Sequence, residues 1–420
     1  MSDFDKNRYS KTLSEMVQIA TISHGDEVET DNIKEMRAYF QNRFPLIATK
    51  CEWKDFNGGL MIKFAGSSDK QPLALMSHMD VVMAQEGWDF EPFGGIIKDG
   101  KILGRGAADT KGSLCAIFES VEKLIGEGYI PSSDVYILSS SREEVAGQDA
   151  RLMAQYFKDK GIIPALLVDE GGAILDKPMA GVSGEYAMIA MSERSSAKLY
   201  LQGSEQNINK LKSKVAKTQL IKSVFPPEVE EMFRRLSVTM SNPMKFVFTH
   251  FNAFRGLLLK VLPKVNAQAG AMVKPSVAFK KSDKAEYQCQ CSIASTFYLD
   301  IDKVIAKFVS IANKYSVSVK VDIVRHAPRA TDYNSEGVKL VERTVKATMP
   351  SVRTTPFIIF GGTDARHFVD VADCVVRFAP LKMNNEIISS VHNRNEYIFE
   401  ESIYNAVVFY YNLVKLFDQQ

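Results

Sequence analysis

Short apolar segments alternate with longer amphipathic ones in the first half of the chain, and this alternation constrains the fold more than any other feature of the sequence. Three segments have the length and uniform apolarity of buried strands: "PLALMS" at 72–77, "DVYILSS" at 134–140 and "PALLVD" at 164–169. Between the first two, "KGSLCAIFESVEKLI" repeats apolar residues at helical spacing. The alternation predicts an α/β fold with a mixed, largely parallel sheet and helices on both of its faces.

The pattern changes near residue 192. There "AKLYLQG" and "YQCQCSIASTFYLDI" alternate like antiparallel strands, while "INKLKSKVAKTQLIKSV" and "DKVIAKFVSIANKY" have the spacing of amphipathic helices. After "RHAPRA" at 325–330 the α/β pattern returns, with a helix in "SEGVKLVERTVKATM", strands in "FIIFGG" and "CVVRFAP", and a final helix. We therefore predict one α/β domain built from residues 1–191 and 328–420, with an inserted α+β domain at 192–327.

The composition narrows the possible partners and compartments. With 52 basic and 50 acidic residues the formal net charge is only +2, which gives no reason to expect nucleic acid as a partner. Five scattered cysteines, an odd number, fit reduced thiols better than a disulfide framework. The polar N-terminal stretch "MSDFDKNRYSKTLSEMVQIA" has neither a secretory signal nor a membrane anchor. We predict a cytoplasmic protein.

The most apolar stretch of the chain, "MKFVFTHFNAFRGLLLKVLPK" at 244–264, contains several charged and polar residues. These interruptions exclude a membrane span. We expect a helix of the inserted domain, and the alternative is a membrane-surface or lipid-binding element. Its phenylalanines, Phe246, Phe248, Phe251 and Phe254, make an apolar acyl group conceivable in the substrate.

Residues that bind metals follow each of the three predicted strands. His78 and Asp80 come directly after the first strand, and Asp109 lies in the loop "GRGAADTKG" before the next helix. The second strand leads into Glu143 and Glu144, and the third into Asp169 and Glu170. The carboxyl ends of strands in an open α/β sheet are where ligands bind, and adjacent like charges there are unfavourable without a cation.

Each of these residues also has a simpler explanation. Asp109 or Thr110 could cap the following helix, and Glu143 and Glu144 could form a solvated turn. Together, however, they favour a metal site whose last donor comes from "FGGTDARHF" or "SVHNRNEYI" in the C-terminal part. A set of two imidazoles and three carboxylates suits two zinc ions that share a bridging carboxylate. The proposed ligands are His78, Asp109, Glu144, Glu170 and His392, which leaves Glu143 free to act as a base.

Six motifs resemble, in order, those of the co-catalytic zinc exopeptidase family that includes aminoacylase, carboxypeptidase G, acetylornithine deacetylase and succinyl-diaminopimelate desuccinylase. They are "SHMDVV", "GWDFEPFGGIIKDGKILGRGAADTKG", "REEVAG", "VDEGGAI", "GGTDARHF" and "VHNRNEYI". The long matches are most similar to the carboxypeptidase S-like branch of N-acyl-amino-acid hydrolases. The resemblance covers nearly the whole chain.

The resemblance implies a role for each matching residue. His78 and Glu170 would hold one zinc ion, Glu144 and His392 the other, and Asp109 would bridge them. Asp80 would orient His78, Glu143 would be the general base, and Arg366 would lie near a substrate carboxylate. In "VDEGG" either Asp169 or Glu170 could ligate, and the family pattern favours Glu170. The inserted domain would be a lid that mediates homodimerisation.

The lid departs from the family pattern. Where the family has a histidine that stabilises the oxyanion, this chain reads "LQGSEQNIN", and Tyr298 stands where an arginine is expected. Two function classes follow. The first is a zinc hydrolase of small peptides or N-acyl amino acids with a free carboxylate, in which Gln206, Asn207 or Tyr298 replaces the missing donor. The second is a catalytically weakened metal-holding binding or regulatory protein. Retention of Glu143 favours the enzyme.

Overall fold

The computed structural model describes residues 4–25, 30–265 and 267–419. The chain forms two compact units. Unit 1 comprises residues 1–189, 331–355 and 363–420, and unit 2 comprises residues 190–330 and 356–362. The sequence predicted that the two domains meet at 191/192 and 327/328. The structure shows that a second segment, residues 356–362, also belongs to unit 2.

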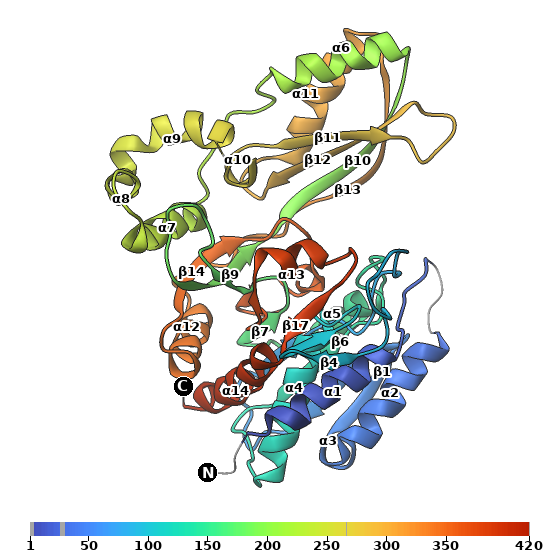
Figure 1. Cartoon of the computed structure of the whole chain (residues 1–420), viewed down its shortest axis with the longest axis vertical. Coiled ribbons are helices and arrows are strands. Elements are labelled where there is room, and N and C mark those ends of the chain that lie inside the picture. Colours follow the sequence, from blue (N-terminus) through green and yellow to red (C-terminus); the bar gives the residue numbers. More distant parts are fainter. Residues whose placement is uncertain (1–3, 26–29, 266, 420) are drawn as a thin grey trace. The chain divides into compact units, whose positions relative to one another are not determined.

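Unit 1 contains the central sheet, whose strand order is β1-β2-β6-β3-β7-β15-β9-β8-β16, with β14 paired to β9 (Figure 1). Its strands are β1 (Glu52–Phe56), β2 (Gly59–Phe64), β3 (Leu73–Met76), β6 (Val135–Ser139), β7 (Leu166–Asp169), β8 (Ile174–Asp176), β9 (Glu185–Ser192), β14 (Arg353–Ile358), β15 (Val375–Arg377) and β16 (Lys382–Met383). Strand β3 pairs in parallel with both β6 and β7, and β15 pairs in parallel with β7. The predicted mixed, largely parallel sheet is confirmed.

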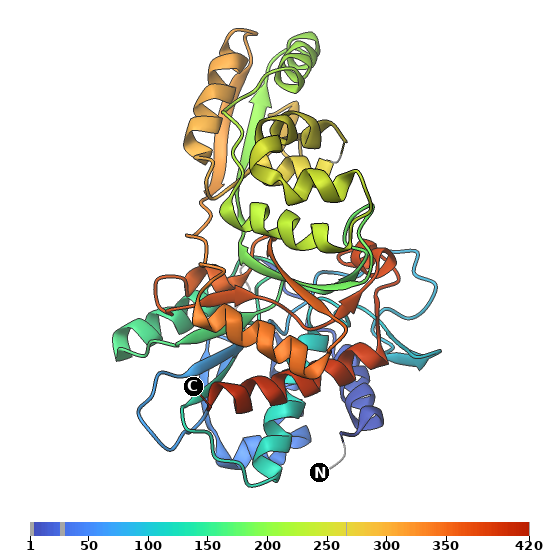
Figure 2. The ribbon, with the colours of Figure 1, turned by 90° about the vertical axis from the view of Figure 1, so that its left-hand side faces the viewer.

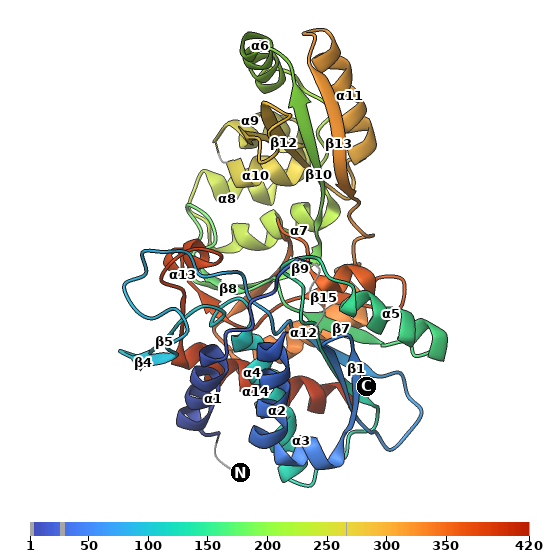
Figure 3. The same ribbon diagram turned by 90° about the vertical axis from the view of Figure 1, so that its right-hand side faces the viewer.

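Helices cover both faces of this sheet. On one face, α12 and α14 pack side by side, as their orange and red ribbons show in Figure 2, and α14 also packs on α1 and α4. On the other face, α5 and the turn η2 pack on β-strand residues such as Ala74 and Leu167. Figure 3 shows α5 at this side of the sheet. The helices of unit 1 are α1 (Lys6–Gln18), α2 (Asp31–Arg43), α3 (Pro45–Lys50), α4 (Lys111–Gly126), α5 (Asp149–Lys160), α12 (Glu336–Thr348), η2 (Asp364–His367), α13 (Asn385–Ser390) and α14 (Glu400–Phe417).

A small antiparallel sheet joins the loop after β3 to the C-terminal part of the chain. It consists of β4 (Ile96–Lys98), β5 (Lys101–Leu103) and β17 (Tyr397–Phe399), in the order β17-β5-β4. Because β17 pairs with β5, the segment just before it is held beside the segment just after β5. Those two segments carry His392 and Asp109.

Unit 2 is an α+β unit whose antiparallel sheet has the order β11-β12-β10-β13. Its core forms between this sheet and helices α6 and α11, with Leu199, Cys291, Leu211 and Phe308 among the buried residues. The elements of unit 2 are β10 (Arg194–Gln202), α6 (Glu205–Ala216), α7 (Pro227–Leu236), η1 (Ser237–Thr239), α8 (Met244–Thr249), α9 (Phe251–Val265), α10 (Ala267–Val273), β11 (Ser276–Lys281), β12 (Cys289–Thr296), α11 (Ile301–Asn313) and β13 (Ser318–Arg325).

For two helices of unit 2 the predicted end points are wrong. The helix expected through Val224 ends at Ala216. The apolar stretch at 244–264, expected as one helix, is two helices that break at His250, where Nδ1 of the imidazole lies 2.9 Å from the carbonyl oxygen of Phe246. A side chain that bonds its own backbone in this way competes with helix continuation. Among the described residues, no helix has the length and apolarity required to cross a membrane.

Gly172, two residues after Glu170, provides a test of how tightly this part of unit 1 is packed. A Cβ atom there would lie 2.2 Å from the carbonyl oxygen of Met188 and 2.5 Å from that of Arg377. We expect Gly172→Ala to lower the free energy of unfolding by about 1–3 kcal/mol, because two backbone segments must move. Gly256→Ala in α9 is the matched control. With no atom within 4 Å of its Cβ, it should stabilise slightly. Chemical denaturation measures both, and equal effects would contradict the prediction.

Candidate metal centre

The carboxyl ends of β6, β3 and β7 bring the predicted metal-binding residues together. These strands are neighbours and run in parallel, so the residues that follow them meet at one edge of the sheet. His78 and Asp80 follow β3, Glu143 and Glu144 follow β6, and Glu170 follows β7. The sequence pattern "strand, then ligand" therefore has a simple geometric basis.

Asp109 lies between two histidines from different parts of the chain. Its Oδ1 is 3.2 Å from Nε2 of His78, and its Oδ2 is 3.0 Å from Nε2 of His392. The same Nε2 atom of His392 lies 3.0 Å from Oε2 of Glu144. One carboxylate thus faces two imidazoles, one on each oxygen, and a second carboxylate joins the His392 side. This is the arrangement expected of a bridging ligand between two metal ions.

The charges of this cluster are strongly coupled. Hydrogen bonds that the imidazole donates to the carboxylates of Asp109 and Glu144 raise the pKa of His392 to about 10. Burial opposes protonation of His78, but its contacts with Asp109 and Asp80 outweigh burial and raise its pKa well above the usual value. Burial would raise the pKa of Asp109, yet the two histidines lower it below its usual range. Each imidazole is therefore held close to negative charge that can also attract a metal ion.

Asp80 has two positioning contacts. Nδ1 of His78 lies 2.9 Å from the backbone carbonyl oxygen of Asp80 and 3.3 Å from its Oδ1. The two carboxylate oxygens of Asp80 also accept the backbone N–H groups of Glu143 and Glu144, both at 3.1 Å. Asp80 is fully buried. It consequently fixes the ring of His78, as the sequence predicted, and also the turn that carries both glutamates, which the sequence did not indicate.

Glu396 is a second positioning residue, and the sequence analysis missed it. Its Oε1 accepts the backbone N–H groups of Ala108 and Asp109 at 2.9 and 3.0 Å, while its Oε2 pairs with Nη1 of Arg105. Nη2 of Arg105 also donates to the carbonyl oxygen of Asn393 at 2.7 Å. This buried pair ties the Asp109 loop to the His392 loop. An acidic residue four positions after a candidate histidine is the only sequence signal for it.

The backbone at His392 is in the left-handed region, with φ of 57°. Few residues other than glycine adopt this conformation, and it persists where surrounding contacts determine it. The contact of Arg105 with the neighbouring Asn393 provides such a constraint. The conformation directs the imidazole of His392 toward Asp109 and Glu144.

Three further carboxyl groups near the centre differ in their surroundings. Burial raises the pKa of Glu143 to about 8, and the charges of Glu144 and Asp109 add to the shift. Burial, followed by the charges of Asp109 and Asp169, raises the pKa of Glu170 well above its usual value. Oδ2 of Asp169 accepts the backbone N–H of Ala365 at 2.8 Å, so it has a structural partner.

The donor set fits a metal ion. Ligand atoms of His78, Asp109 and Glu144 all lie within 4.8 Å of one another, which is close enough to share a cation. Oε1 of Glu144 is buried and has no hydrogen-bond donor among the described residues, as expected of an oxygen that requires a cation. Thr110, at the N-terminus of α4, makes no side-chain capping bond. The alternative role of the "GRGAADTKG" loop as a simple helix cap is therefore not supported at Thr110.

Arg366 lies in η2, close to the carboxyl end of β7. The backbone N–H of Ala365 in η2 donates a hydrogen bond to the carboxylate of Asp169. Asp169 directly precedes Glu170, so this bond holds η2 beside the end of β7. Arg366 is half-buried, and its Nε donates to the carbonyl oxygen of Thr363 at 3.1 Å. The backbone contact orients the guanidinium group.

The lid residues suggested as replacement donors all lie in unit 2. Ser204 caps α6 and accepts the backbone N–H of Asn207, so the segment that replaces the family's histidine motif is a helix start. Gln206 and Asn207 are in the first turn of this helix. Tyr298 follows β12, is 38% exposed and hydrogen-bonds to Glu228.

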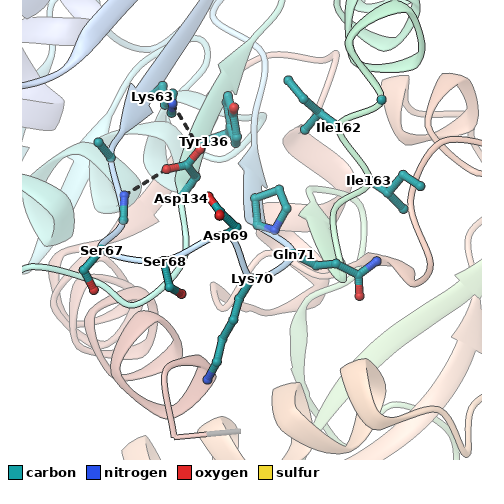
Figure 4. A pocket seen from close by; sticks show the side chains of 14 residues that line it. Lys63, Ser67, Ser68, Asp69, Lys70, Gln71, Asp134, Tyr136, Ile162 and Ile163 are labelled. Atoms are coloured by element: carbon teal, nitrogen blue, oxygen red, sulfur yellow. Dashed lines mark hydrogen bonds and ion pairs between the residues drawn. The ribbon is translucent and has the colours of Figure 1, made fainter.

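A shallow hollow of about 600 Å³ lies at the opposite end of the sheet, before β3, β6 and β7 (Figure 4). The polar groups around it bond with one another. Nζ of Lys63 lies 3.1 Å from Oδ2 of Asp134, whose other oxygen accepts the N–H of Gly66. Because ligands of open α/β sheets bind at the carboxyl ends of strands, this hollow does not compete with the metal centre as the functional site.

The fold and the cluster define an α/β protein with a group of side chains that could hold a metal ion, and comparison with known proteins shows its family. The model of peptidase family M20/M25/M40 matches residues 74–416. The chain belongs to this family and is a hydrolase of amide or peptide bonds. The resemblance drawn from the six sequence motifs is confirmed.

The most similar relatives and structures extend over nearly the whole chain. An N-fatty-acyl-amino acid synthase/hydrolase, PM20D1 of Xenopus tropicalis, is 26% identical over 99% of this chain and 87% of its own. The probable carboxypeptidase S-like 2 of Dictyostelium discoideum is 25% identical, over 97% of this chain and 84% of the Dictyostelium protein. The M20 family metallo-carboxypeptidase Sso-CP2 of Sulfolobus solfataricus has a similar fold, with a TM-score of 0.68, 17% identity and coverage of 98% and 99%. The dinuclear metal-binding peptidase YXEP of Bacillus subtilis gives a TM-score of 0.57, with 12% identity and 99% coverage of both chains.

Metal binding at this centre should strengthen as the pH rises. Before a metal binds, the raised pKa values of His78 and His392 keep both imidazoles protonated near neutral pH, and a metal must displace these protons. We expect the zinc affinity to increase by about tenfold per pH unit for each proton displaced, between about pH 6 and pH 9. Titration calorimetry in two buffers of different ionisation heat counts the protons released.

The control for this measurement is His326→Ala, which removes an exposed histidine of unit 2 that pairs with Asp302. It should leave the proton count unchanged, whereas His392→Ala should lower it. A zinc affinity that is constant over the same pH range would show that neither imidazole is a ligand.

Proposed function

We propose that the chain is a zinc-dependent hydrolase, with two zinc ions, that cleaves the amide bond of small peptides or N-acyl amino acids carrying a free carboxylate. The observation that carries this proposal is the position of Asp109 between His78 and His392, at 3.2 and 3.0 Å. A carboxylate that presents one oxygen to each of two imidazoles is suited to bridge two ions.

In this proposal His78 and Glu170 would hold one zinc ion, Glu144 and His392 would hold the other, and Asp109 would bridge them. The engagement of Asp169 with the backbone of Ala365 supports Glu170 as the ligand from the third strand. Nitrogen and carboxylate donors suit zinc, and the open coordination position of a catalytic zinc site leaves room for water and substrate.

Glu143 is the proposed general base. When bound, zinc lowers the pKa of water to about 7 and polarises the substrate carbonyl group. Glu143 receives the proton that this water loses and delivers it to the leaving amine nitrogen as the C–N bond breaks. Asp80 holds the backbone of Glu143 during both steps.

Arg366 is the proposed reader of the substrate carboxylate. A guanidinium group can make two parallel hydrogen bonds to a carboxylate, which a lysine ammonium cannot. Relatives with similar sequences are an N-fatty-acyl-amino acid synthase/hydrolase and a probable carboxypeptidase, which supports a substrate that carries such a carboxylate.

The second candidate is a metal-holding binding or regulatory protein with weakened catalysis. The observation in its favour is that the segment at the start of α6, where the family has its lid histidine, contains no histidine. A turnover screen of the zinc-loaded protein against dipeptides and N-acyl amino acids distinguishes the two. Stoichiometric zinc with no turnover across the panel would favour the second candidate.

We also propose that the protein forms a homodimer through unit 2 and is located in the cytoplasm. Strand β13 is at the edge of its sheet, and Val321 and Ile323 on it are 42% and 43% exposed. An edge strand with exposed apolar residues can pair with another chain. The five free cysteines suit a reducing compartment.

Replacing Glu143 with Gln should retain both metals and abolish turnover, because the amide has a similar shape and cannot accept the proton. We expect kcat to fall by about 10²–10⁴-fold. Metal content by mass spectrometry and turnover are measured on the same sample. Glu52→Gln, on the exposed strand β1, is the control and should have full activity. Retained activity in the Glu143 variant would refute its role.

Replacing Arg366 with Lys should weaken catalysis only for substrates with a free carboxylate. We expect kcat/KM to fall by about tenfold or more, corresponding to loss of one charge-assisted hydrogen bond of about 1.5–3 kcal/mol. The corresponding substrate amides are compared in parallel. Equal losses on the carboxylates and on their amides would assign Arg366 a structural role.

A further inference from the structure

A long part of unit 2 has a positive charge that the chain's overall balance hides. Between residues 232 and 282 there are nine lysines and arginines and no aspartate or glutamate, which leaves 43 basic and 50 acidic residues in the rest of the chain. The nine are Arg234, Arg235, Lys245, Arg255, Lys260, Lys264, Lys274, Lys280 and Lys281. Helices α8 and α9 lie in the middle of this segment.

One side of α9 belongs to the core of unit 2. Phe251, Leu258 and Leu262, spaced as one stripe of a helix, are at most 7% exposed. The ring of Phe251 packs on that of Phe225 at 4.9 Å, and Phe248 of α8 stacks on Phe233 at 4.7 Å. Phe248 and Phe251 are therefore structural, and they are not available to a substrate's acyl group in this packing.

A second apolar stripe, next to the first, faces solvent. Leu257 and Val261 of α9 are 55% and 40% exposed, and Phe254, three residues before Leu257, is half-buried. Phe246 of α8 is 55% exposed, and its ring lies 6.0 Å from that of Phe254. These four side chains form a continuous apolar stripe across two helices. Unit 2 thus contains enough apolar residues here for two stripes and buries only one.

Exposed lysines flank this stripe. Lys260 and Lys264 lie three residues after Leu257 and Val261, and Lys245 precedes Phe246. In the described part of the chain none of the three has a carboxylate within ion-pair distance, whereas Arg255, nearer the core stripe, pairs with Glu230 at 2.6 Å. Unpaired lysines beside an exposed apolar stripe are the composition of helices that lie in the interface of a membrane.

We propose that α8 and α9 bind the surface of an anionic phospholipid membrane, with Phe246, Phe254, Leu257 and Val261 in the acyl boundary and Lys245, Lys260 and Lys264 at the headgroups. The positive charge of this segment decides between two possible partners for the surface, a second copy of the chain and an anionic membrane. A second copy of the chain would bring two segments without carboxylates against each other, and like charges would repel. An anionic bilayer complements both the lysines and the apolar stripe. This inference does not rest on the hydrolytic function.

Flotation of the full-length protein with vesicles tests the proposal. We expect binding to phosphatidylcholine vesicles that contain about one third phosphatidylserine, little binding to phosphatidylcholine alone, and weaker binding at high salt. The triple variant Lys245→Gln, Lys260→Gln, Lys264→Gln should reduce partitioning to the anionic vesicles by about fivefold for each lysine removed. The double variant Phe246→Ser, Leu257→Ser should reduce partitioning to both kinds of vesicle.

Two control variants make the same chemical changes elsewhere. Lys210→Gln, Lys214→Gln, Lys217→Gln removes three exposed lysines in and after α6, and Ile130→Ser, Ile163→Ser removes two exposed apolar residues of unit 1. Neither should affect partitioning. The absence of vesicle binding, or equal losses in the test and control variants, would overturn the proposal. A further result would also overturn it: the protein does not bind vesicles, sedimentation shows that it self-associates, and the test variants abolish this self-association. The surface would then bind a second copy of the chain.

Discussion

The buried ion pair between Glu396 and Arg105 is the contact on which the candidate metal centre depends most. It joins the loop that carries Asp109 to the loop that carries His392, two segments between which the whole of unit 2 lies in the sequence. Breaking a buried pair leaves an uncompensated charge and typically costs about 3–5 kcal/mol. The same carboxylate also holds the backbone N–H of Asp109. Stability and ligand geometry are thus set by one side chain.

Much of unit 1 could be predicted because the sequence patterns that indicate its strands and site residues are confined to short segments of the chain. Uniform apolarity marks β3, β6 and β7, and the residues after each strand are brought together by parallel pairing alone. The contacts of Asp80 with the backbone of Glu143 and Glu144, and those of Glu396 with the backbone of Ala108 and Asp109, could not be predicted. Each depends on backbone N–H groups whose direction is fixed by loops, and loop conformation leaves little trace in the periodicity of a sequence.

Unit 2 was predicted less well, for a different physical reason. The stretch at 244–264 is apolar on two sides of its helices, so its periodicity did not reveal the break at His250. The break comes from a contact between that imidazole and the carbonyl group of Phe246, which acts over four residues and has no hydropathy signature. The second segment of unit 2, at 356–362, was also missed. The apolar run "FIIFGG" fits a strand in either unit equally well.

The discontinuity of unit 1 has a consequence for the order in which the protein matures. Ribosomes release the chain from its N-terminus, so His78, Asp109, Glu144 and Glu170 are all available before unit 2 has been synthesised. His392 and Glu396 emerge only after the whole of unit 2, which has had time to fold as an independent body. A nascent chain therefore carries an incomplete centre until the segment at 392–399 has been synthesised. The complete site forms only when β17 pairs with β5.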